Sequence, residues 1–151
     1  GNVGTGKSFI AGCIANALLD QGVPVMMTNF ARLLNKLTDM YSGDRNAYIN
    51  SFNSFPLLII DDLGVERNSE FAREQVFNII DSRYRSKLPM IVTTNLTVDE
   101  LKNPADLARG RIYDRVLERC TAIKVNDQNI RKLNMAENLA KAKQLLEGVT
   151  K

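Results

Sequence analysis

The sequence predicts an α/β fold in which helices flank both faces of a parallel β-sheet. Apolar runs of strand length alternate with segments of helical periodicity, and this alternation is typical of parallel sheets. A glycine-rich motif opens the chain, and one apolar run ends in two adjacent carboxylates. The 151 residues, with 44% hydrophobic and 25% charged residues, suit one globular domain over residues 1–151.

The opening motif has the pattern of a P-loop, in which four residues separate a glycine from Gly-Lys-Ser. Backbone N–H groups of such a loop, together with the start of the following helix, surround phosphate groups. We expect Lys7 to reach the β- and γ-phosphates of a nucleotide, and the Ser8 hydroxyl to be one ligand of Mg²⁺. A chance match is expected in about one chain of this length in a few hundred. The nucleotide-binding residues are Gly1, Asn2, Val3, Gly4, Thr5, Gly6, Lys7 and Ser8.

The composition excludes several kinds of site. The chain has no histidine, which excludes zinc sites and histidine-activated nucleophiles. Cys13 and Cys120 lie far apart in sequence, and Cys13 is expected to be buried in an apolar helix face. No apolar run approaches the length of a membrane span and no signal-peptide pattern is present, so we expect a cytoplasmic protein. Because a P-loop follows a buried strand, we also expect the sequence to be a fragment whose preceding strand is missing.

The positive charge is concentrated in the C-terminal part. From Arg109 onward there are ten Lys and Arg residues against five Asp and Glu, and before it ten against twelve. This surplus is either a solvated face or a surface for nucleic acid or for the phosphates of a neighbouring subunit.

The first half of the chain reads as helix, strand and helix. Apolar residues within 6–21 recur at three- and four-residue steps, and Gly22 ends this helix. Residues 25–28 are expected to form a short buried strand, and Asn29 to cap the next helix. The two apolar faces consist of Phe9, Ile10, Cys13, Ile14, Ala17 and Leu18, and of Phe30, Leu33, Leu34 and Leu37.

A longer connection follows before the next strand. The helical pattern breaks at residues 42–44, and a second amphipathic segment is expected over residues 47–55. The connection combines aromatic and basic side chains, which could stack on the bases of a single strand and contact its phosphates. The alternative is that these aromatic residues belong to the core. The residues are Tyr41, Arg45, Tyr48 and Phe52.

Two strands end in polar residues. Four apolar residues at 57–60 precede Asp61 and Asp62, which is the form of a Walker B strand. Open α/β sheets place their ligand crevice at this edge, so Asp61 is expected to support Mg²⁺ and Asp62 to hold the attacking water. A further strand over residues 89–95 ends in Asn95, a candidate sensor of the γ-phosphate.

The remaining segments are expected to be helical except for one strand. Ser69 is expected to cap a helix to about residue 87, and Thr97 to open a capping box. Residues 121–125 are expected to be the last strand, followed by a C-terminal helix at about 128–147. A row of arginines lies four residues apart on one helix face, either as surface ion pairs with Asp114 and Glu118 or to contact phosphates. This row is Arg111, Arg115 and Arg119.

The order of these motifs resembles that of AAA+ ATPases, a class of P-loop NTPases. The stretches LLIIDDLG, NIIDSRYRSKLPMIVTTNL and RIYDRVLERC resemble the helicase-loader branch, the DnaC and DnaI type, including phage and mobile-element versions. The similarity covers nearly the whole chain and extends to the IstB transposition helper ATPases.

This resemblance implies a set of roles. Gly1 to Ser8 would bind ATP, with Asp61 serving Mg²⁺, Asp62 polarising the water and Asn95 acting as sensor 1. It further implies that Arg115 is the arginine finger acting on an adjacent subunit, with Arg111 as the second choice, and that Arg131 lies at the sensor 2 position. Typical AAA+ proteins have a multi-helix lid, whereas one C-terminal helix is expected here, which weakens the assignment of Arg131.

The resemblance also implies partners and a function. The connection over residues 30–55 stands where loaders contact single-stranded DNA, and the part that binds the replicative helicase lies upstream of the P-loop. The implied function is ATP-dependent helicase loading at the initiation of DNA replication. The alternatives are an IstB-like transposition helper, a small-molecule P-loop kinase and a scaffold that binds nucleotide without hydrolysing it. A GTPase is disfavoured, because residues 93–96 do not form an Asn-Lys-x-Asp motif.

Overall fold

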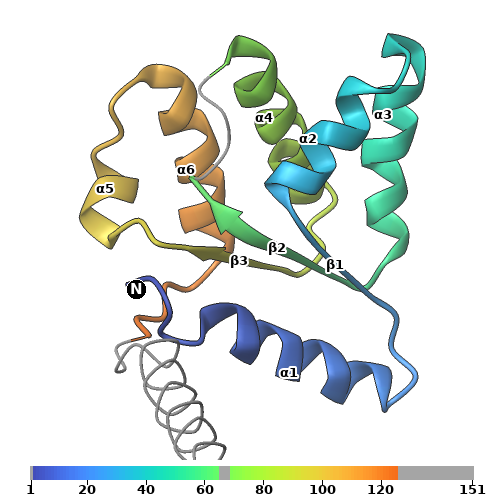
Figure 1. Ribbon diagram of the computed structural model, residues 1–151, viewed down its shortest axis with the longest axis vertical. Helices are drawn as coiled ribbons and strands as arrows, with labels where there is room; N and C mark the ends of the chain where they lie inside the picture. Colours follow the sequence, from blue (N-terminus) through green and yellow to red (C-terminus); the bar gives the residue numbers. More distant parts are fainter. Residues whose placement is uncertain (1, 65–68, 126–151) are drawn as a thin grey trace, which may run out of the picture.

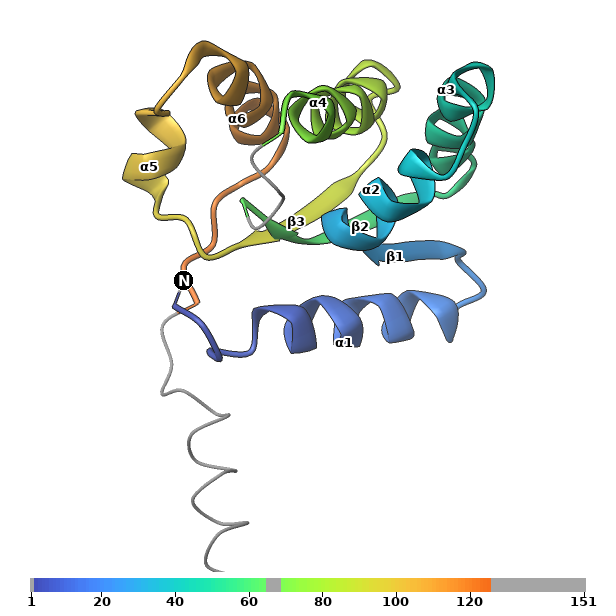
Figure 2. The same cartoon turned by 45° about the horizontal axis from the view of Figure 1, so that its top comes forward.

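A parallel three-stranded sheet lies between two layers of helices in the computed structural model, which describes residues 2–64 and 69–125. The strands β1 (Val25–Asn29), β2 (Leu57–Leu63) and β3 (Met90–Thr94) lie side by side in that order. Helix α1 (Lys7–Leu19) lies on one side of the sheet and the other helices lie on the opposite side (Figure 2). These are α2 (Phe30–Thr38), α3 (Ser42–Ser51), the 3-10 turn η1 (Phe52–Ser54), α4 (Glu70–Arg85), α5 (Val98–Lys102) and α6 (Leu107–Arg119), shown in Figure 1. The predicted three-layer α/β architecture is confirmed.

Strand β2 is the centre of the core. Leu58, Ile59 and Ile60 are 0% exposed, because β2 has a neighbouring strand on each side and helices above and below. Successive side chains of a strand point to opposite faces. Leu58 and Ile60 accordingly belong to the larger core with α2, α4 and α6, whereas Leu57 and Ile59 pack with α1. This burial fixes the position of the polar residues that end the strand.

Local side-chain caps start the helices where the sequence predicts them. Asn29, Ser69 and Thr97 each accept a hydrogen bond from the backbone N–H three residues later. In the capping box the Glu100 carboxylate accepts from the backbone N–H of Thr97, and this bond lowers the pKa of Glu100. Asp106 caps α6 in the same way, which the sequence analysis does not identify. These caps satisfy N–H groups that the helices themselves leave free.

The prediction that Cys13 is buried is wrong. Helix α1 turns Ala11 and Ala15 toward the sheet, whereas Cys13 is exposed and Phe9 is 73% exposed. The small alanine side chains let the helix lie close to β2, so the bulkier apolar stripe faces away. Cys120 is half-buried instead, its thiol donates to the Met90 carbonyl at 3.7 Å, and burial raises the pKa of this thiol.

Three further features of the secondary structure differ from the prediction. The predicted break between the two helices lies at residues 39–41, and residues 42–44 form the first turn of α3, where the Asp44 carboxylate is favourable near the helix N-terminus. Strand β1 is half-buried rather than buried, since it pairs with β2 alone. Residues 121–125 form no strand, because they make no ladder with a strand in the described part of the chain. The helix predicted at about 128–147 lies outside the described residues.

Arg83 is a buried cation that joins three segments. It belongs to α4 and is 1% exposed. The guanidinium donates to the carbonyls of Phe52 at 3.3 Å, Pro56 at 2.9 Å and Pro89 at 2.7 Å. Burial lowers its pKa, but the carbonyl oxygens satisfy its donors. Arg83 thereby holds the segments that enter β2 and β3 against α4.

Replacing Arg83 with leucine should lower the free energy of unfolding by about 3 kcal/mol or more. The substitution leaves three buried or half-buried carbonyls without their donor, each costing about 1–3 kcal/mol. Urea unfolding followed by circular dichroism measures this change. The matched control is Arg85→Leu on the same helix, where an exposed ion pair is lost at a cost of about 1 kcal/mol or less. Equal losses for the two variants would contradict the role of Arg83 as a buried clamp.

Candidate nucleotide-binding site

The loop before α1 has the backbone conformation of a phosphate cradle. Gly4 and Gly6 have φ of 81° and 90°, in the left-handed region that favours glycine. No side chain caps α1 at Gly6, so the first N–H groups of a thirteen-residue helix are directed at the loop. The Thr5 hydroxyl donates to the Asn2 carbonyl at 2.9 Å, which closes the loop on itself. Gly1 lies outside the described residues.

Lys7 connects the loop to the end of β3. Its Nζ donates to the Asn2 carbonyl at 2.7 Å and to Oδ1 of Asn95 at 2.8 Å. Lys7 and Asn95 are 88 residues apart in sequence, and the parallel sheet brings the P-loop and the tip of β3 together. A cation and an amide therefore lie side by side at the open edge of the sheet, where the sequence analysis expects a phosphate and its sensor.

Asp61 joins the P-loop helix to two strand ends. One of its oxygens, Oδ1, accepts from the Ser8 hydroxyl at 2.8 Å and from the Thr93 hydroxyl. The same Thr93 oxygen accepts from the backbone N–H of Asp62 at 3.1 Å. Thr93 is a site residue that the sequence analysis does not single out. Its signal is a hydroxyl among apolar residues near the end of a strand.

Strand β2 bulges at the site. The pairing between β2 and β3 shifts between Ile60 and Leu63, and Asp62 has φ of 63°. A left-handed conformation is uncommon outside glycine and is best tolerated by Asn and Asp. The Asp62 carboxylate makes no hydrogen bond or ion pair with the described residues, and the bulge, rather than simple strand alternation, sets its direction. Thr94 holds the bulge by donating to the Leu63 carbonyl at 2.7 Å.

The Ser8 and Asp61 oxygens fit a Mg²⁺ ion that is held mostly by water and phosphate. A hydroxyl and a carboxylate are hard oxygen ligands, and Mg²⁺ usually takes one or two carboxylates plus substrate phosphates. Within residues 2–64 and 69–125 there is no cluster of three or more acidic, cysteine or histidine side chains that could hold a metal ion.

The comparisons with known proteins agree with this geometry. The family model of the IstB-like ATP binding proteins matches residues 1–138. The chain belongs to this family. The matched range includes the P-loop, Asp61 and Asn95.

Curated relatives of this IstB-like chain include helicase loaders. The replicative helicase loader DnaC of Escherichia coli K12 is 29% identical over 119 residues, which cover 77% of this chain and 47% of DnaC. The replicative helicase loader DnaI of Bacillus subtilis strain 168 is 27% identical over 145 residues, covering 87% of this chain and 46% of DnaI. The chain thus spans about half the length of the curated relatives it matches.

Solved structures support the fold of this IstB-like chain. The crystal structure of DnaI has a TM-score of 0.69 at 25% identity, covering 85% of this chain and 69% of that one. The DnaC helicase loader has a TM-score of 0.64 at 23% identity, covering 83% and 75%. AMPPCP-bound DnaA from Aquifex aeolicus has a TM-score of 0.63 at 19% identity, covering 95% and 54%. The predicted AAA+ P-loop fold is confirmed.

The arginine row lies away from this cluster, on α6. Arg115 pairs with Asp81 of α4 at 2.7 Å rather than with Asp114 or Glu118. Arg111 is exposed, and Arg119 donates to the Lys87 carbonyl at 2.7 Å. The ion pairs expected along the helix are therefore replaced by contacts to the neighbouring helix and turn. Arg131 lies outside the described residues.

The aromatic and basic residues of the 41–55 connection are mostly used inside the fold. Phe52 is buried and Tyr48 packs against its ring edge, with the centroids 5.0 Å apart. Arg45 donates to a backbone carbonyl of α2 at 2.8 Å and lies over an aromatic ring of α4. Tyr41, in contrast, is 86% exposed. Tyr48 and Phe52 therefore belong to the core, as the alternative reading of this segment predicts. Tyr41 does not.

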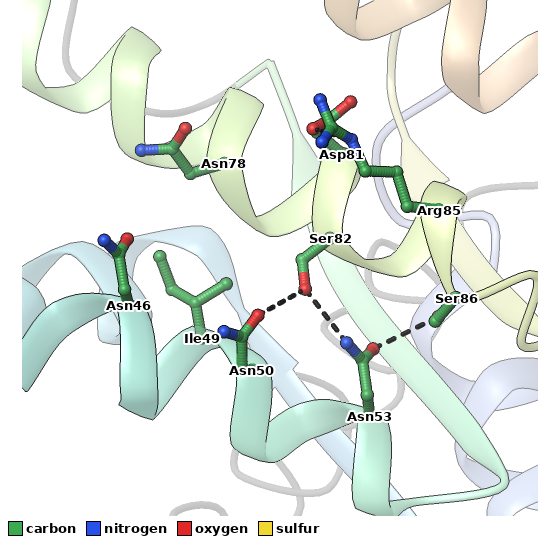
Figure 3. Close-up of a pocket in the computed structure, with 9 residues that line it drawn as sticks. All are labelled: Asn46, Ile49, Asn50, Asn53, Asn78, Asp81, Ser82, Arg85 and Ser86. Carbon is green, nitrogen blue, oxygen red and sulfur yellow. Dashed lines mark hydrogen bonds and ion pairs between the residues drawn. The ribbon is translucent and has the colours of Figure 1, made fainter.

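A polar groove of about 430 Å³ lies between α3 and α4, apart from the nucleotide cradle (Figure 3). Hydrogen bonds cross it at one end. Ser82 donates to Asn50 at 3.1 Å and accepts from Asn53 at 2.9 Å, and Ser86 donates to Asn53 at 3.3 Å. These bonds tie the two helices together, so they account for several of the polar side chains in the groove.

No helix in the described ranges is long and apolar enough to cross a membrane.

Proposed function

We propose that this chain is the ATP-hydrolysing domain of a helicase loader, which couples nucleotide state to helicase and single-stranded DNA binding. The observation that carries the proposal is the contact of Ser8 with Asp61 beside that of Lys7 with Asn95. It supports a nucleotide site in which hydroxyl, carboxylate, cation and amide all lie at one sheet edge. The relatives named as replicative helicase loaders support the biological role.

Each residue of the site would have a separate role in ATP hydrolysis. The loop N–H groups and Lys7 would hold the β- and γ-phosphates, and Asn95 would orient the γ-phosphate through its amide. Mg²⁺, held by Ser8, Asp61 and the phosphates, would neutralise charge on the phosphate oxygens. Asp62 would accept a proton from a water molecule as the water oxygen bonds to the γ-phosphorus and the bond to ADP breaks. The products are ADP and inorganic phosphate.

The proposal includes a neighbouring subunit. Arg115 lies on α6 rather than among the residues that surround the P-loop, which is compatible with a finger acting on the adjacent subunit's ATP. Arg111, one turn earlier, is the second choice for this role. In the region of 41–55 a DNA contact would rest on Tyr41, because Arg45 and Tyr48 are engaged internally. The basic surplus from Arg109 onward would add phosphate contacts and make DNA affinity fall with salt.

Two other functions fit part of this site. A transposition helper of the IstB type would use the same nucleotide chemistry with a different partner, and the family match supports it equally. A small-molecule kinase would share the P-loop but transfer the phosphoryl group to an acceptor. Asp62 favours water as the nucleophile, because its carboxylate makes no hydrogen bond or ion pair with the described residues and could accept one from a water molecule.

Asp62→Asn should bind MgATP normally but hydrolyse it at least about 100-fold more slowly, since the amide cannot accept the proton of the water. Asparagine tolerates the left-handed backbone at this position, so the substitution adds little strain. The matched variant Lys7→Ala should lose most ATP affinity instead, because it removes the cation at the cradle. Titration with a fluorescent ATP analogue and a phosphate-release assay without any acceptor measure both effects. Undiminished turnover in Asp62→Asn would remove that residue from its role.

Arg115→Ala should reduce hydrolysis by about 10³-fold or more while leaving ATP binding intact, because an arginine finger stabilises transition-state charge. Mixing this variant with Lys7→Ala protein should restore activity, since each supplies what the other lacks. Phosphate release from the separate and mixed proteins measures the effect. Normal hydrolysis by Arg115→Ala alone would exclude the finger.

The partner is tested by a pull-down that uses the full-length protein. A replicative helicase and a transposase are offered in parallel, with and without ATP, and single-stranded DNA is tested for an effect on phosphate release. We expect the helicase to be retained and its retention to depend on nucleotide. Retention of transposase without helicase under both conditions would overturn the loader role and favour the transposition helper.

A further inference from the structure

Arg115 is held by α4 more firmly than an ordinary surface arginine. Its Nε donates to Oδ1 of Asp81 at 2.7 Å, and its Nη1 donates to the Arg111 carbonyl at 2.9 Å. The guanidinium carbon lies over two rings, 4.6 Å from the Phe77 centroid and 5.5 Å from that of Tyr84. One carboxylate, one carbonyl and two ring faces therefore fix the plane of the guanidinium.

One edge of this guanidinium stays available. A guanidinium has five N–H donors, of which the two bonds above use one on Nε and one on Nη1. Neither hydrogen of Nη2 makes a hydrogen bond with a described residue, and the Arg115 side chain is 26% exposed. Planar pairs of N–H donors suit phosphate oxygens. The fixed cation thus keeps one edge without a hydrogen-bond partner among the described residues, and that edge fits a phosphate.

The Asp81 side chain is largely shielded from solvent and faces Arg115. Its side chain is 13% exposed, half the exposure of Arg115. Its other oxygen, Oδ2, accepts from Nε of Arg85 at 2.8 Å, and Arg85 is 76% exposed. Asp81 and Arg85 lie at the wall of the polar groove, as Figure 3 shows. The two oxygens of the Asp81 carboxylate therefore bind two different arginines. A substitution of Arg85 removes one of these ion pairs and leaves the pair with Arg115, so it can serve as a control.

Tyr84 completes the support. Its hydroxyl donates to the Glu118 carboxylate at 2.9 and 3.0 Å, which links α4 to α6 one turn beyond Arg115. This hydrogen bond to the Glu118 carboxylate raises the pKa of the Tyr84 phenol. The ring under the guanidinium is thereby held in place.

We propose that Asp81 is a positioning residue for Arg115, which holds its guanidinium so that the Nη2 edge meets the ATP of a neighbouring subunit. The inference rests on the proposed role of Arg115 as an arginine finger. A long flexible side chain that is already fixed loses less freedom in reaching the transition state. The opposite effect, in which Asp81 withholds Arg115 from the phosphate, would predict that removing the carboxylate speeds hydrolysis.

The test compares four variants of the full-length protein. They are Asp81→Asn, Arg85→Ala, Arg115→Ala and the double variant Asp81→Asn with Arg115→Ala. We expect Asp81→Asn to lower kcat about tenfold with an unchanged KM for ATP, because the finger is misplaced but the ATP site of each chain is intact. Arg85→Ala should change kcat less than about twofold, since Arg85 pairs with the other oxygen of the Asp81 carboxylate and not with the one that binds Arg115. In the double variant Asp81→Asn should add no further loss to that of Arg115→Ala.

Mixing separates positioning from folding. Asp81→Asn protein keeps its own ATP site, so adding Lys7→Ala protein, with an intact Asp81 and Arg115, should restore its hydrolysis. General damage to the fold would not be restored in this way. If Asp81→Asn melts at a lower temperature, Asp81→Glu keeps the carboxylate and should retain a larger share of kcat than Asp81→Asn.

The outcomes that overturn the inference are distinct from those that overturn the finger. A normal or raised kcat in Asp81→Asn, while Arg115→Ala is impaired, removes the positioning role and leaves the finger standing. A further loss in the double variant, or no recovery on mixing, also removes it. Normal hydrolysis by Arg115→Ala removes the finger, and the positioning role with it.

Discussion

The hydrogen bonds that meet on the Asp61 carboxylate hold the candidate site together. They join Ser8 at the start of α1, Asp61 at the end of β2 and Thr93 near the end of β3. These elements are separate in sequence. A parallel sheet brings its strand ends to one edge, and the polar contacts then fix the loop against that edge. The nucleotide chemistry argued for Lys7, Asp62 and Asn95 depends on this arrangement.

The buried part of β2 makes such a polar cluster possible. Leu58, Ile59 and Ile60 are packed on both faces, so the strand cannot shift its register without exposing them. The rigid strand then bulges at Asp62, where the chain adopts a left-handed conformation next to the site. The neighbouring Gly64 has φ of 93°, and a Cβ there would lie 2.9 Å from the Leu96 side chain. The end of β2 is thus shaped by close approach on one side and by the Thr93 hydroxyl on the other.

Features that depend on local sequence could be predicted, and those that depend on long-range packing could not. The P-loop, the caps at Asn29, Ser69 and Thr97, and the apolar run of β2 each follow from a few consecutive residues. The orientation of α1 did not follow, because that helix is apolar around most of its circumference and its alanines gave no signal. The exposure of Cys13 is the consequence.

The polar contacts that were missed share one physical cause. Arg83 and Thr93 each bind groups that are distant along the chain, and neither stands in a motif that names its partner. The acceptors that Arg83 binds within the described residues are backbone carbonyls, so no acidic residue in the sequence indicates that this arginine is buried. Such contacts are specified by packing, in which a side chain satisfies whatever acceptors the fold places around it.

Packing also separates the three arginines that the sequence places in one row. Their spacing puts Arg111, Arg115 and Arg119 on one face of α6, but the contact with α4 gives each of them a different environment. Arg111 is exposed and offers its carbonyl, Arg119 reaches a turn, and Arg115 lies between a carboxylate and two aromatic rings. A guanidinium that is fixed in its plane and open along one edge is better prepared to meet a phosphate than a freely moving one, because less motion remains to be lost. The tertiary contacts with α4 therefore favour Arg115 over Arg111 as the finger, a preference that the row's spacing alone does not provide.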